Sequence, residues 1–72
     1  MELSGKIKRQ NIATGVWSLV ANNGQVYELY NYPTEIRQDN LSVQITGQIR
    51  EDIMTIAMIG PVLEVKSYQV LD

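Results

Sequence analysis

Side chains that could carry out catalysis or bind a metal are scarce in this sequence. It contains no cysteine and no histidine, which removes thiolate nucleophiles, disulfides and the commonest ligands of zinc, copper and haem. A nucleophile or general base would have to come from serine, threonine, tyrosine, lysine or a carboxylate. Glu51 and Asp52 are adjacent carboxylates, but neighbours in a turn between strands point apart. We therefore expect no enzyme, no metal and no cofactor.

Aromatic side chains offer a different chemistry, because exposed rings stack on nucleic-acid bases and on sugars. Trp17, Tyr27 and Tyr30 lie in two expected strands, and Tyr32 follows directly after the second of them. Alternation along those strands predicts that Trp17 and Tyr27 face the core. Tyr30 and Tyr32 are therefore the better candidates for ligand contacts.

Three basic residues near the start, Lys6, Lys8 and Arg9, could contact phosphates or could be ordinary solvated strand residues. The whole chain has six basic and eight acidic residues, so its formal charge is −2. That sign disfavours nucleic acid as the main partner. Together with Tyr30 and Tyr32, these residues form an alternative ligand surface, for single-stranded nucleic acid or an oligosaccharide.

The longest apolar run, Ile53 to Ile59, has the length of a strand and is apolar on both expected faces. If one face joins the core, then Met54, Ile56 and Met58 form a second apolar face that needs cover. That cover could be the segment 33–38 or another protein, and flexible methionines suit a protein contact. Our leading hypothesis is a non-catalytic module that binds a protein partner or itself through these three side chains.

Short apolar runs at regular spacing predict an all-β domain. Residues 41–49 alternate between apolar and polar positions, which is typical of a half-buried strand. Asn23 and Gly24 predict a hairpin turn, and Gly5 predicts a bend in the first strand. One helical turn or a structured loop is expected between residues 31 and 40, with Ile36 pointing inward. The expected strands are 3–9, 16–21, 25–30, 41–49, 53–59 and 62–71.

A barrel of five or six strands is the fold that this pattern favours, with one short helical turn after the third strand. The strings TGVWSL (14–19), GQVYEL (24–29), VQITG (43–47) and GPVLEV (60–65) resemble a group of short, uncharacterised bacterial proteins with OB-like folds. The OB fold is a Greek-key barrel that binds oligonucleotides or oligosaccharides. The resemblance implies a fold and no activity, because its positions are turn glycines and core residues.

Length predicts a single domain over residues 1–72. The first residues lack the basic start and apolar stretch of a signal peptide. No apolar run approaches the roughly 18 residues that span a bilayer. The absence of cysteine is compatible with a reducing compartment. We therefore expect a cytoplasmic protein that does not contact membranes.

Overall fold

A computed structural model describes residues 1–12, 15–55 and 57–71 of the chain. These residues form five β-strands and one turn of 3-10 helix. The elements are β1 (Glu2–Gln10), β2 (Val16–Ala21), β3 (Val26–Tyr30), η1 (Thr34–Ile36), β4 (Ser42–Ile49) and β5 (Val62–Val70). The expected helical turn after the third strand is confirmed, and five of the expected strands are present.

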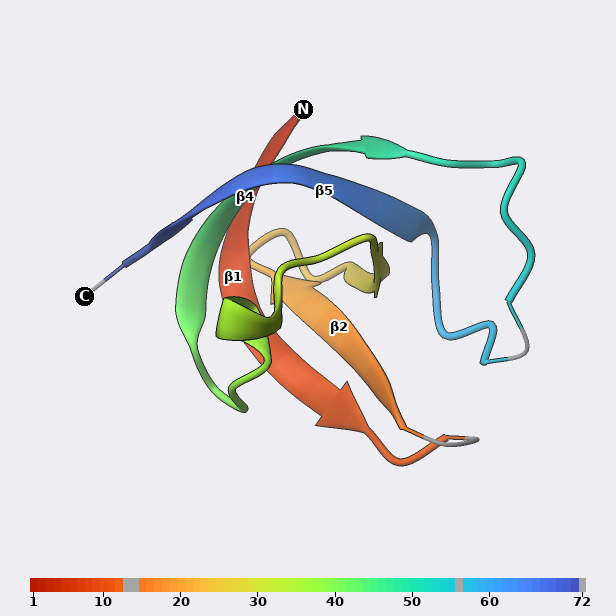
Figure 1. Cartoon of the computed structure of the whole chain (residues 1–72), viewed down its shortest axis with the longest axis horizontal. Helices are drawn as coiled ribbons and strands as arrows, with labels where there is room; N and C mark the ends of the chain where they lie inside the picture. Colours follow the sequence, from red (N-terminus) through yellow and green to blue (C-terminus); the bar gives the residue numbers. More distant parts are fainter. Residues whose placement is uncertain (13–14, 56, 72) are drawn as a thin grey trace.

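The five strands close into a barrel in the order β1-β2-β3-β5-β4, with β4 pairing again with β1 (Figure 1). Four of the pairings are antiparallel, whereas β3 and β5 run parallel. The parallel pair joins strands that are not consecutive, so the chain must cross the barrel between them. This arrangement confirms the small all-β, OB-like barrel that the sequence predicts.

Alternation along the strands builds the core as expected. In β4, Val43 and Ile45 are fully buried, while their polar neighbours Ser42, Gln44 and Thr46 are partly exposed. Leu19 of β2 lies directly opposite Tyr27 of β3, and both side chains are buried. The predicted inward position of Tyr27 is therefore confirmed. Trp17 is half-buried and packs against the same core.

Gly5 lies where β1 changes partners, since the first half of β1 pairs with β4 and the second half with β2. A Cβ atom at Gly5 would lie 2.2 Å from the carbonyl oxygen of Val20. Only glycine allows the two backbones to approach this closely. The sequence predicted a bend at this glycine, and what the structure shows there is a close approach of two backbones.

η1 contributes one side chain to the core. Ile36 is fully buried within the main hydrophobic cluster, while its neighbours Glu35 and Arg37 are exposed. A single helical turn is unstable alone, so the burial of Ile36 is what holds this turn on the barrel. The inward position expected for Ile36 is confirmed.

The expected strand over residues 53–59 is wrong. The described residues of this segment belong to no strand, and the chain between β4 and β5 forms a wide connection at one end of the barrel (Figure 1). Met58 has a φ of 49°, in the left-handed region that strands do not use. The barrel is already closed by β3, β5 and β4, so a sixth strand would find no unpaired edge in it.

Candidate functional site

The β4–β5 loop (residues 50–61) carries the most exposed apolar side chains of the described chain. Met54 is 96% exposed and Met58 is 81% exposed. The segment 33–38 therefore does not cover these two methionines, contrary to one of the alternatives that the sequence left open. Ile56, the third residue of the predicted surface, lies outside the described residues.

Thr55 attaches this loop to the barrel. Its hydroxyl donates a hydrogen bond of 2.8 Å to the carboxylate of Glu28 on β3. The same hydroxyl oxygen accepts a hydrogen bond of 3.3 Å from the backbone N–H of Met58. Only 7% of Glu28 is exposed, although it faces away from the core. The loop thus contacts Glu28 on the outer face of β3 while Met54 and Met58 stay in solvent.

An ion-pair network holds the base of the loop. Arg50 lies 2.9 Å from the carboxylate of Glu64 on β5 and 2.7 Å from that of Asp52. The hydrogen bond from Arg50, with a smaller contribution from Lys66, holds the pKa of Glu64 below its ordinary range against the opposing effect of desolvation. The same guanidinium lowers the pKa of Asp52. Arg50 is therefore a cross-link between the first residues of the loop and β5.

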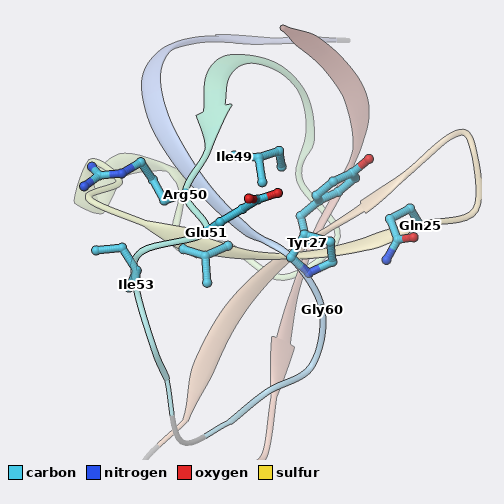
Figure 2. A pocket seen from close by; sticks show the side chains of 9 residues that line it. Gln25, Tyr27, Ile49, Arg50, Glu51, Ile53 and Gly60 are labelled. Carbon is cyan, nitrogen blue, oxygen red and sulfur yellow. The ribbon is translucent and has the colours of Figure 1, made fainter.

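Two hollows adjoin the loop. The first has a volume of about 550 Å³, and Figure 2 shows Gln25 and Tyr27 on one side of it with Arg50 and Ile53 on the other. The second has a volume of about 410 Å³ and lies against the methionines. Both are lined by Ile53, Gly60, Pro61 and Val62. The exposed side chains of Met54 and Met58 therefore lie beside mainly apolar hollows on one surface.

The alternative ligand surface is divided by the structure. Lys6 and Lys8 alternate with the buried Ile7, so they lie on the outer face of β1. Lys8 donates a hydrogen bond to the side chain of Asn40. Arg9 has the opposite parity and pairs with Trp17 across β1 and β2. The strict alternation of a strand is the signal that separates Arg9 from the two lysines.

Of the predicted ligand residues, Arg9 and Tyr32 come together. They line a hollow of about 460 Å³ with Gly15, Trp17, Thr34 and Arg37. Tyr30 is 39% exposed and is not among the residues that line that hollow. Sequence reasoning missed Arg37, because it follows η1 in a segment without a strand's periodicity.

The adjacent carboxylates Glu51 and Asp52 do not converge on one site. Glu51 lines the larger hollow beside the loop, whereas Asp52 pairs with Arg50. Within residues 1–12, 15–55 and 57–71, no three acidic side chains gather as a metal site would require. Over the same residues, no helix is long and apolar enough to cross a membrane.

Comparison with protein-family models, with curated proteins and with solved structures finds no match. The resemblance to short bacterial OB-like proteins therefore stays a prediction.

Proposed function

We propose that this chain is a non-catalytic module that binds protein through its β4–β5 loop, with Met54 and Met58 as the main contacts. The observation that carries the proposal is their exposure of 96% and 81% in a domain with few large apolar side chains to spare. Removing one exposed methionine side chain from water contributes roughly 1.5–3 kcal/mol, against which the entropy cost of association acts. Methionine also adapts its shape to a partner surface.

The loop has a defined base, which lowers the entropy cost of binding. Thr55 holds its middle to Glu28, and Arg50 holds its start to Glu64. The two methionines are therefore presented from a segment with fixed attachment points. A cytoplasmic location belongs to the same proposal, on the basis of a chain without cysteine.

Self-association is the form of this proposal that the surface favours. The hollow of about 410 Å³ lined by Ile53 and Val62 lies directly beside Met54 and Met58. A twofold axis places the same patch of two copies face to face, so a protrusion on each copy meets a hollow on the other. A different protein with an apolar groove is the alternative partner.

The solution mass, measured by sedimentation over a series of concentrations, tests the proposal. We expect a dimer that dissociates on dilution, and we expect Met58→Lys to remain monomeric because it places a charge in the contact. Ile12→Lys is the matched control, since Ile12 is a partly exposed apolar residue outside the loop. A strict monomer removes self-association. A dimer that Met58→Lys leaves intact removes the loop as the contact.

The second candidate, an OB-type ligand-binding domain for a single nucleic-acid strand or an oligosaccharide, has weaker support. Its expected contacts, Tyr30, Tyr32, Lys6, Lys8 and Arg9, do not form one continuous surface, because Lys6 and Lys8 lie on the outer face of β1. The net charge of −2 also opposes the binding of a long polyanion. A flat titration with oligonucleotides at low salt would remove the nucleic-acid version.

A further inference from the structure

A polar hollow of about 460 Å³ lies where the ends of β1 and β2 meet the segment around η1. It shares no lining residue with the two hollows beside the β4–β5 loop. Its volume falls within the range of about 300–1,000 Å³ that is typical of small-molecule sites. The residues that line it are Arg9, Gly15, Trp17, Tyr32, Thr34 and Arg37.

The guanidinium of Arg9 is held in place at this hollow. It donates a hydrogen bond of 3.0 Å to the side-chain oxygen of Asn11. On its other side lies Gly15, where a Cβ atom would be 2.5 Å from the Arg9 Nη2 atom. Gly15 also has a φ of 102°, which residues other than glycine rarely adopt. Glycine at this position therefore leaves the space that the guanidinium occupies.

Positive charge at the hollow is not neutralised by the described part of the chain. Among the described residues, the ion pairs join Arg50 to Asp52 and Glu64, and Lys66 to Glu64. Arg9 and Arg37 take part in none of these pairs. Of the nearby acids, Asp39 accepts a hydrogen bond from the backbone N–H of Arg9, and neither Asp39 nor Glu35 lines the hollow. Two guanidinium groups thus face one cavity without a carboxylate in its lining.

Two aromatic rings complete the lining. Trp17 and Tyr32 are both half-buried and pack against the hydrophobic core. Packing of this kind fixes the rings, so they present aromatic surface at little further entropy cost. Thr34 adds a hydroxyl that can donate or accept a hydrogen bond. The hollow therefore combines fixed positive charge with fixed aromatic surface.

We propose that this hollow binds one phosphate group of a small ligand that also carries a planar ring, of which a nucleoside monophosphate is the simplest example. The planar forks of Arg9 and Arg37 suit the oxygens of a phosphate, which can accept paired hydrogen bonds. The rings of Trp17 and Tyr32 suit stacking on a base. The proposal does not depend on the loop contact, because the two surfaces share no residue.

Trp17 is the sole tryptophan of the chain, so its fluorescence reports directly on this hollow. We would titrate the protein with adenosine monophosphate, adenosine and inorganic phosphate in separate experiments at low salt. We expect a saturable change with the monophosphate, and binding at least tenfold weaker with either part alone. A short single-stranded oligonucleotide, with and without a terminal phosphate, distinguishes a free nucleotide from the end of a strand as the source of the phosphate.

Arg37→Gln is the first variant, since Arg37 is exposed and its replacement should not disturb the fold. We expect it to weaken monophosphate binding by about tenfold or more, the effect of losing a charged hydrogen bond. Lys6→Gln makes the same charge change on the outer face of β1 and should leave the affinity within about twofold at moderate salt.

Three outcomes would overturn the proposal. The first is the absence of a saturable signal at millimolar monophosphate. The second is an equal loss of affinity in the Arg37 and Lys6 variants, which would indicate attraction by net charge alone. The third is binding that strengthens with oligonucleotide length and ignores the terminal phosphate, which would indicate a surface for a nucleic-acid strand instead.

Discussion

The hydroxyl of Thr55 donates a 2.8 Å hydrogen bond to the carboxylate of Glu28, and this bond joins the middle of the β4–β5 loop to the outer face of β3. The two residues are 27 positions apart in the sequence. Glu28 is buried beneath the loop, so its carboxylate depends on protein donors in place of water. The bond therefore fixes the middle of the loop on the barrel, as the ion pair between Arg50 and Glu64 fixes its start.

Replacing Thr55 with valine should expose this dependence. The side chains have similar shapes, but valine cannot donate to Glu28, and a buried acceptor left without its donor costs about 1–3 kcal/mol. We expect the urea midpoint of Thr55→Val to fall accordingly. Thr34→Val, at an exposed threonine on η1, should leave the midpoint nearly unchanged. Equal midpoints for the two variants would show that the bond does not contribute to stability.

The ion pairs of Glu64 should make the free energy of unfolding depend on pH in the acid range. Arg50 lowers the pKa of Glu64 in the folded chain below its ordinary value of 4.5. A lowered folded-state pKa stabilises the fold above the unfolded-state value, and that contribution disappears as the pH falls through the folded-state value. We therefore expect stability to decline from about pH 4.5 downward, measured by urea unfolding at successive pH values.

Arg50→Gln tests the cause of this acid dependence. Removing the guanidinium should lower stability at neutral pH and make the decline in acid shallower, because Glu64 then titrates closer to its ordinary value. Arg37→Gln removes the same charge from a side chain outside the ion pairs of the described residues. If both variants keep the acid dependence of the parent chain, another carboxylate is responsible for it.

Ile36 should contribute strongly to stability although it belongs to a single helical turn. It is 0% exposed, and no neighbouring residue of η1 shares its burial. We expect Ile36→Ala to cost about 2–5 kcal/mol and Ile36→Val about 0.5–1.5 kcal/mol, measured by urea unfolding. Ile12→Ala, at a partly exposed residue, should change stability by less than about 0.5 kcal/mol. A small effect of Ile36→Ala would mean that η1 is not held by this side chain.

The local sequence pattern was sufficient to predict a strand and its inward face where only one face of the strand is buried. In β4, the alternation of Val43 and Ile45 with polar residues predicts both the strand and its inward face, because a pleated strand repeats every two residues. The same rule places Tyr27 in the core. It also places Arg9 on the other side of β1 from Lys6 and Lys8. Grouping these three residues by charge alone ignores this alternation.

Apolar composition was not sufficient to predict the structure of the segment 53–59. Its residues have the character of a buried strand, but a strand also requires a free neighbouring edge, and that is a property of the whole sheet. The barrel closes through β3, β5 and β4, so the described residues of the segment form no strand, and Met54 and Met58 lie in solvent. Exposure of these methionines follows from closure and not from their own sequence.

The sequence by itself determined the all-β class, most strand positions, the helical turn with its inward Ile36, and the lack of histidine and cysteine chemistry. Each of these depends on residue type or on spacing along one element. Tertiary structure alone decided the parallel pairing of β3 with β5, the loop in place of a sixth strand, and the meeting of Arg9, Trp17, Tyr32 and Arg37. These features join segments that are distant in the sequence, and no local period encodes which distant segments become neighbours.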